Sequence, residues 1–185
     1  MDLAEIARRL ELEDLYAAYA ACLDSDALEA WPDFFTDDCH YRVTSAENYE
    51  TGLPLGLIYA SSKDMLRDRI SALRQANIYE PQRYRHLISG IRPRPHPNPP
   101  PQAGEGTRKH PPPQAGKGGV GVDPESLAVE ANFLVIRTMQ DGAMIVFAAG
   151  RYVDRMVRGD AGWRFASKIV VLDSRHIDTL LAIPL

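Results

Sequence analysis

The sequence has few cysteines, no long apolar run and no excess of basic residues, and each absence excludes a class of protein. Two cysteines among 185 residues are too few for a disulfide framework, so nothing indicates an oxidising compartment. No stretch approaches the roughly 18 apolar residues of a membrane span, and the acidic start lacks the basic region of a secretory signal. A formal charge of -4 argues against a nucleic-acid-binding protein. We therefore expect a cytoplasmic protein that binds neither nucleic acid nor a membrane.

Motifs that hold metals or phosphates are missing as well. A Rieske cluster needs two cysteines and two histidines in pairs at short spacing. Cys39 and His40 form a single adjacent pair, and side chains of adjacent strand residues point to opposite faces. Of the five histidines, His96 and His110 lie in a low-complexity segment, and no helix carries two at i, i+4. There is no Gly-rich phosphate loop and no Gly-x-Ser-x-Gly motif. The sequence predicts no metal or cofactor in this chain.

What the sequence does contain is alternation of apolar and polar residues, which is typical of strands. Long strands are predicted at 82–92, 127–140, 143–157 and 163–172, with a short one at 39–44. The long strands exceed the usual five or six residues, so their sheet must curl and needs an apolar cover on its concave face. Asp141-Gly142 predicts a two-residue type I′ turn between the second and third long strands.

Apolar residues at helical spacing predict the cover for this sheet. Helices are predicted at 3–24, at 27–35 and from Ser61 onward, where Ser61-Ser62-Lys63-Asp64 resembles a capping box. We expect Ser25 or Asp26 to cap the second helix, and an irregular connection over 45–60. Three N-terminal helices before long antiparallel strands predict an α+β fold, the cone of the nuclear transport factor 2-like (cystatin-like) proteins.

Residues 94–121 differ in composition from the rest of the chain. They hold most of the prolines, and the motif Pro-Pro-Pro-Gln-Ala-Gly at 99–104 recurs at 111–116. Such a segment buries too little apolar surface to offset its ordering entropy, so it is predicted to be a flexible insert. Recognition by an SH3-type partner is an alternative. Strand patterns resume on both sides, so residues 1–185 are predicted to form one domain.

His86 is the candidate for acid–base chemistry, because a His–Asp pair with a tyrosine suits dehydration or isomerisation of a small substrate. The residues that could meet it in a cavity are Tyr84, Asp24, Asp26, Asp38 and Tyr41. The alternative is structural: a hydrogen-bonded histidine and tyrosine, with the aspartates ending and capping helices. A small-ligand-binding module without chemistry is a third interpretation of the same residues.

Cationic side chains recur on one face of the predicted strands. They are Arg83, Arg85, Arg151, Arg155, Arg164 and Lys168, interleaved with Leu87, Phe147, Val153 and Val170. A mixture of arginine and apolar side chains is typical of a protein interface. The sequence therefore predicts that the outer face of the sheet is a subunit contact, with a solvated face as the alternative.

Several segments resemble the small (beta) subunits of Rieske-type aromatic-ring-hydroxylating dioxygenases, terephthalate-type members above all. They are 24–27, Trp31-Pro32-Asp33-Phe34-Phe35-Thr36, 38–44, 64–74, 78–86 and 178–185, whereas the insert departs from the pattern. The resemblance implies a non-catalytic assembly subunit that joins a large (alpha) subunit, commonly as three of each, with contacts among the small subunits as a trimer. It also implies that the large subunit carries the Rieske 2Fe-2S cluster and the mononuclear non-haem iron.

Overall fold

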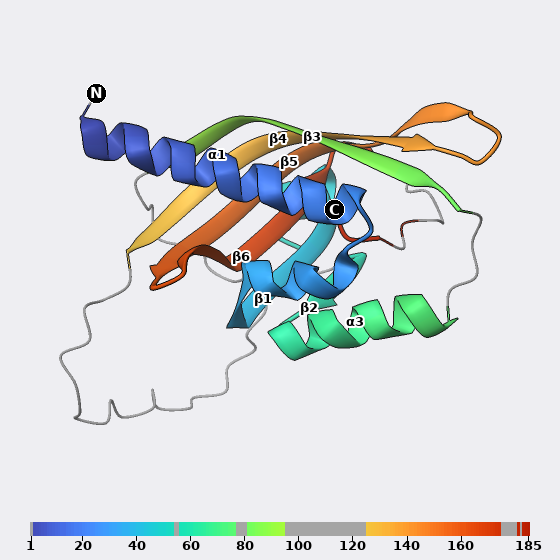
Figure 1. The fold of residues 1–185 in the computed structure, drawn as a ribbon, viewed down its shortest axis with the longest axis horizontal. Helices are drawn as coiled ribbons and strands as arrows, with labels where there is room; N and C mark the ends of the chain where they lie inside the picture. Colours follow the sequence, from blue (N-terminus) through green and yellow to red (C-terminus); the bar gives the residue numbers. More distant parts are fainter. Residues whose placement is uncertain (1, 54–55, 77–80, 95–124, 175–180, 182) are drawn as a thin grey trace.

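The computed structural model describes residues 2–53, 56–76, 81–94, 125–174, 181 and 183–185. Its helices are α1 (Leu3–Asp24), α2 (Ala46–Glu50) and α3 (Lys63–Ala76), with a 3-10 helix η1 (Leu28–Phe34). Its strands are β1 (Phe35–Ser45), β2 (Ile58–Ala60), β3 (Arg83–Arg94), β4 (Ser126–Thr138), β5 (Met144–Gly159) and β6 (Gly162–Leu172). Figure 1 shows one curled sheet with α1 lying across it, which confirms the predicted α+β architecture.

The sheet has the strand order β2-β1-β6-β5-β4-β3, so β2 and β3 are its edges. Four of its five pairings are antiparallel, but β1 runs parallel to β6, with Tyr41 opposite Lys168. The prediction of a purely antiparallel sheet is wrong at this pairing. A parallel pair needs a long crossover connection, and everything between β1 and β6 in the chain supplies it.

Aromatic side chains dominate the core beneath α1. Leu12, Tyr16, Tyr19 and Leu23 of this helix are buried, and Leu15 is half-buried. The Tyr19 ring meets that of Phe165 edge-to-face, with centroids 5.5 Å apart, a favoured arrangement for aromatic pairs. Among the helices of the described residues, none combines the length and apolar character needed to cross a membrane.

The hairpin between β4 and β5 turns differently from the prediction. Gly142 has a φ of 88°, whereas Asp141 lies outside the positive-φ region, so the turn is not type I′. The Gly142 amide donates to the Met139 carbonyl at 3.0 Å, and the Ala143 amide donates to the Asp141 carboxylate at 2.9 Å. These bonds define a three-residue loop that ends with a glycine in the left-handed region.

Two β-bulges reverse predicted side-chain directions. Ala166 is an extra residue between the pairs Arg155↔Ser167 and Met156↔Phe165, and Phe147 is extra opposite β4. Because one extra residue moves the following side chains to the other face, Lys168 points into the core. The predicted places of Lys168, Val170 and Phe147 on the outer face are therefore wrong.

Capping also departs from the prediction at the second helix. Residues 28–34 form a 3-10 helix after Ala27 without a side-chain cap. Ser25 instead donates from Oγ to the Ala21 carbonyl at 2.7 Å and so ends α1, while Asp26 has a φ of 59°. At α3 the cap lies one residue later than the predicted box: the Ser62 Oγ accepts from the Met65 amide at 3.3 Å, while Asp64 binds Arg67 at 2.9 Å.

The connection at 45–60 is more regular than predicted, because it contains α2 and β2. Ser45 caps α2 by accepting from the Asn48 amide at 3.3 Å. The predicted insert at 94–121 lies outside the described residues except for Arg94, whose backbone pairs with Ala128. The strands that flank the insert are therefore neighbours in one sheet.

Candidate functional site

His86 and Asp24 form the pair that the sequence predicted. His86 Nδ1 lies 2.7 Å from Asp24 Oδ1, and the His86 backbone amide donates to both carboxylate oxygens at 3.0 and 3.1 Å. Asp24 is the last residue of α1, and His86 lies on the edge strand β3. The backbone amide faces the open edge of the sheet, so the carboxylate satisfies a donor that no neighbouring strand can reach.

The surroundings of this pair favour a structural role. The His86 side chain is 0% exposed, and its Nε2 has no hydrogen-bond partner among the described residues. A general base must come within hydrogen-bond reach of a substrate proton, and a fully covered ring offers no such access. The Arg85 guanidinium lies 3.8 Å from Asp24 Oδ2.

Replacing Asp24 by alanine is expected to lower the free energy of unfolding by about 1–3 kcal/mol, because it leaves a backbone donor and an imidazole without their partner. Urea unfolding of the purified chain measures this loss. Asp24→Asn, which keeps one acceptor oxygen, is the matched control and should lose less. An alanine variant as stable as the wild type would contradict the capping role.

The other predicted cavity residues have different surroundings. Tyr84 is buried with its ring 5.5 Å from that of Phe147. Asp26 binds Arg74 at 2.8 Å, and Asp38 is exposed. Tyr41 is buried in the core on β1. Among the described residues, His86 and Asp24 are thus the members of the predicted set that are joined by a hydrogen bond.

Residues of the C-terminal segment occupy the interior next to Tyr41. The Tyr41 hydroxyl accepts a hydrogen bond from the Leu185 amide at 3.0 Å and donates one to the Leu185 carbonyl at 3.3 Å. The Tyr19 hydroxyl donates to the same carbonyl at 2.7 Å and accepts from Trp31 Nε1 at 3.1 Å. Leu185 is 1% exposed. Where the sequence suggested a ligand cavity, this part of the interior is filled by the chain itself.

A buried ion pair lies under α1, and the sequence analysis missed it. Lys168 Nζ is 3.0 Å from Asp154 Oδ2, to which the Tyr16 hydroxyl also donates at 2.5 Å, and both charged side chains are 0% exposed. The ammonium lies 3.4 Å from the centroid of the Tyr152 ring and 4.5 Å from that of Phe165. Burial raises the pKa of Asp154 and lowers the pKa of Lys168 to about 8.

The described residues offer no ligand set for a metal. They contain no group of three or more His, Cys, Asp or Glu side chains placed to hold an ion. Cys39 is buried and His40 is exposed, as expected for neighbours on one strand. Burial raises the pKa of Cys39 to about 11, so its thiol is a poor metal ligand. His96, His110 and His176 lie outside the described residues.

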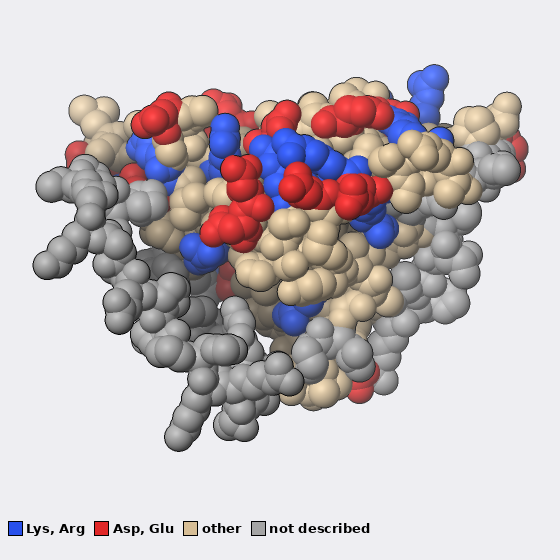
Figure 2. Space-filling view, turned by 90° about the horizontal axis from the view of Figure 1, so that it is seen from below, with Lys and Arg blue, Asp and Glu red and all other residues tan. Residues whose placement is uncertain are grey.

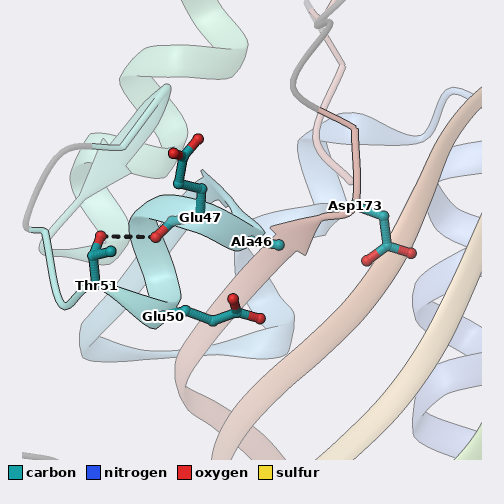
Figure 3. A pocket seen from close by; sticks show the side chains of 5 residues that line it. All are labelled: Ala46, Glu47, Glu50, Thr51 and Asp173. Carbon is teal, nitrogen blue, oxygen red and sulfur yellow. Dashed lines mark hydrogen bonds between the residues drawn. The ribbon is translucent and has the colours of Figure 1, made fainter.

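A hollow of about 290 Å³ lies on the surface beside α2. Ala46, Glu47, Glu50, Thr51 and Asp173 line it, and Figure 3 shows their positions between α2 and the end of β6. None of the site residues predicted from the sequence is among them. Its carboxylates suit a basic group better than an apolar ring, so this hollow is not a pocket for an uncharged aromatic substrate.

Five of the six predicted interface cations do lie on the outer face. The strand register places these five side chains on the face of the sheet that points away from the core. They are Arg83, Arg85, Arg151, Arg155 and Arg164. Arg151 is engaged within the chain, 3.9 Å from Glu50 and over the Tyr49 ring. Seen from below, Figure 2 shows acidic and basic side chains mixed in one band beside an area with few charged side chains.

Sequence comparison with known proteins finds a family and relatives that match this chain. Residues 18–98 match the family described as ring hydroxylating beta subunit. The chain is 42% identical over 176 residues to subunit beta 1 of the terephthalate 1,2-dioxygenase terminal oxygenase component of Comamonas sp., covering 95% of this chain and 97% of that one. It is 35% identical over 175 residues to the anthranilate 1,2-dioxygenase small subunit of Burkholderia cepacia, with coverages of 95% and 92%.

Solved structures show the same fold. The crystal structure of a beta subunit assigned to an aromatic-ring-hydroxylating dioxygenase of Novosphingobium aromaticivorans superposes with a TM-score of 0.76, 35% identity and full coverage of both chains. These similarities define a beta subunit with a nuclear transport factor 2-like fold. The chain belongs to the family of small subunits of aromatic-ring-hydroxylating dioxygenases.

Proposed function

We propose that this chain is a non-catalytic assembly subunit of a dioxygenase terminal oxygenase, joined to a large subunit through the outer face of its sheet. The observation that carries the proposal is the composition of that face. Val153 pairs with Ile169 and Val157 with Arg164 across β5 and β6, and Arg155 completes the group. We call these five residues the outer-face patch. Apolar side chains interleaved with arginine favour a protein partner over water.

The chemistry of the complex then belongs to the large subunit. From the resemblance to small subunits of Rieske-type dioxygenases, we infer that the large subunit carries a Rieske cluster and a mononuclear iron. The described residues of this chain form no group of three possible metal ligands. The small chain would contribute assembly and no reacting group. A cytoplasmic location fits its two free cysteines.

The names of the relatives point to a substrate class. They are subunits of terephthalate, anthranilate and p-cumate dioxygenases, all of which are named for aromatic carboxylic acids. We propose an aromatic carboxylate as the substrate of the complex, with terephthalate as the first candidate. We further propose a complex of three large and three small subunits, in which the small subunits also contact one another.

Co-expression with a large subunit encoded beside this chain tests the proposal. The two chains should co-purify, and the complex should consume oxygen with terephthalate when an electron donor such as a reductase with a reduced nicotinamide cofactor is supplied. Reversing two charges in the outer-face patch, Arg155→Glu with Arg164→Glu, should reduce co-purification by about tenfold or more. Arg67→Glu, an exposed change on α3, is the matched control and should leave binding intact. Chains that never associate would refute the proposal, and unchanged binding by the double variant would remove the patch from it.

A further inference from the structure

A short piece of chain without regular secondary structure lies inside the core. It consists of Ile183, Pro184 and Leu185, all of them buried, and we call it the inner segment. Ile183 is 6% exposed and Leu185 is 1% exposed. Because the inner segment belongs to no helix or strand, its buried backbone groups need side chains as hydrogen-bond partners.

Side chains from three elements converge on the Leu185 backbone. The Leu185 carbonyl accepts from the Tyr19 hydroxyl of α1 at 2.7 Å and from the Tyr41 hydroxyl of β1 at 3.3 Å. The Leu185 amide donates to the Tyr41 hydroxyl at 3.0 Å, and Trp31 Nε1 of η1 donates to that of Tyr19 at 3.1 Å. Burial raises the pKa of both tyrosines, so both hydroxyls keep their protons. Together the two hydroxyls bind one oxygen and one N–H.

Aromatic rings enclose these polar groups. The Trp31 ring meets the rings of Tyr41 and Phe35 edge-to-face, with centroids 5.1 and 5.3 Å apart, and the centroids of Phe35 and Tyr41 are 6.0 Å apart. All three side chains are 0% exposed. Apolar walls with a few converging hydrogen-bonding groups are the composition of a small-molecule site. The group that these walls and hydroxyls fit is an amide attached to an apolar body.

We propose that Tyr19 and Tyr41, with Trp31 behind Tyr19, form a binding site for an uncharged aromatic carboxamide that replaces the inner segment. The ligand's carbonyl oxygen accepts from both hydroxyls, its N–H donates to Tyr41, and its ring takes the place of the Leu185 side chain. A carboxylate lacks the N–H and brings a charge into an apolar interior, which is costly. The proposal goes beyond the proposed function, since it concerns the interior of the chain and not the outer face.

In the wild-type chain the ligand competes with the inner segment. The apparent dissociation constant is the intrinsic one divided by the fraction of molecules in which the segment has left the site. A substitution that releases the segment and keeps both hydroxyls must therefore tighten binding. Ile183→Asp meets this requirement, because a charge at a buried position disfavours burial of the segment. Leu185→Ala also releases the segment, by removing apolar contact and without adding a charge.

Titration of the isotope-labelled full chain with benzamide, followed by NMR, tests the proposal. The chain has two tryptophans, and Trp163 serves as an internal control because its Nε1 donates to Glu11 at 2.9 Å, away from the site. Benzamide should shift the Trp31 indole signal to saturation in Ile183→Asp and leave that of Trp163 unchanged. The wild type should bind about tenfold more weakly or less, because its segment must first leave the site. Ile183→Val, which keeps the segment apolar, should behave as the wild type.

Two further measurements locate the ligand on the hydroxyls. Adding Tyr41→Phe to Ile183→Asp should weaken benzamide binding by about tenfold, since one donor and one acceptor are lost. Benzoate should bind Ile183→Asp more weakly than benzamide does, because it lacks the N–H.

Circular dichroism confirms that each variant is folded, and Leu185→Ala replaces Ile183→Asp if the aspartate variant does not fold. A folded release variant without a saturable Trp31 shift, an equal shift of Trp163, or undiminished binding after Tyr41→Phe would each overturn the proposal. Benzoate that binds as tightly as benzamide would overturn the assignment to a carboxamide. Co-purification with the large subunit is measured separately with the outer-face variants, so failure here leaves the proposed function standing.

Discussion

Replacing Lys168 by alanine is expected to lower the free energy of unfolding by about 3–5 kcal/mol, because it leaves the Asp154 carboxylate buried without its charged partner. Asp154 already binds the Tyr16 hydroxyl, but one carboxylate oxygen, Oδ1, has no partner among the described residues. The substitution also leaves a cavity among the rings of Tyr152 and Phe165. Chemical denaturation of the single variant measures the loss.

A double variant separates the cost of an unpaired charge from that of the cavity. Lys168→Met together with Asp154→Leu removes both charges and fills similar volume, so its stability should equal or exceed that of the wild type. Lys168→Met alone should fall between the double variant and Lys168→Ala. A loss below about 1 kcal/mol in the alanine variant would show that the pair is not coupled to folding.

The same pair predicts how stability varies with pH. The pKa of Lys168 is lowered from 10.5 in the unfolded chain to about 8 in the folded protein, so between these values the unfolded state binds more protons. The contribution of Lys168 to the free energy of unfolding therefore rises with pH between about 8 and 10.5. The Asp154 pKa is raised above 3.8, so its contribution is greatest at acid pH and is lost as pH rises through the folded pKa. Lys168→Met should remove the rise above pH 8.

Local periodicity was enough to predict most helices and strands. The helix at 3–24 and the buried stripe of α3 (Leu66, Ile70 and Leu73) were predicted because their signal lies within one element. The direction of the Lys168 side chain was not predicted, because the bulge at Ala166 is defined by the pairing between β5 and β6. A one-residue change of register leaves no mark in the alternation of the strand itself.

The candidate site shows the same limit. The pairing of His86 with Asp24 could be anticipated from residue types, since both lie where a helix end and a strand face meet. The structural role of the pair could not be anticipated, because this role depends on the open edge of β3 and on the complete burial of the imidazole ring. Tyr41 was assigned to a cavity because sequence patterns cannot show that Leu185 occupies the space beside it.

The directions of the cationic side chains were mostly predicted from the sequence, for a physical reason. Five arginines lie on long strands away from the core, where the alternation of the strand fixes the face of each side chain.

Replacing Leu185 by alanine is expected to cost about 2–5 kcal/mol, the range for a large apolar side chain removed from a packed core. Leu185 is 1% exposed, and its backbone amide and carbonyl bind the Tyr41 hydroxyl. Thermal and urea unfolding measure the loss. Tyr41→Phe, which keeps the ring and removes both hydrogen bonds, is the control and should cost about 1–2 kcal/mol. An alanine variant that loses less than this control would contradict the core role of Leu185.

The cavity left by Leu185→Ala provides a second measurement. Aromatic side chains surround this part of the core, since the Trp31 and Tyr41 rings lie 5.1 Å apart, centroid to centroid, and Trp31 donates to Tyr19. An apolar cavity in a core stays dry and binds a small apolar ligand. Benzene should therefore raise the melting temperature of the alanine variant and leave that of the wild type unchanged. Equal shifts in both proteins would mean that this space is open without the substitution, and that Leu185 does not seal the interior between α1 and the sheet.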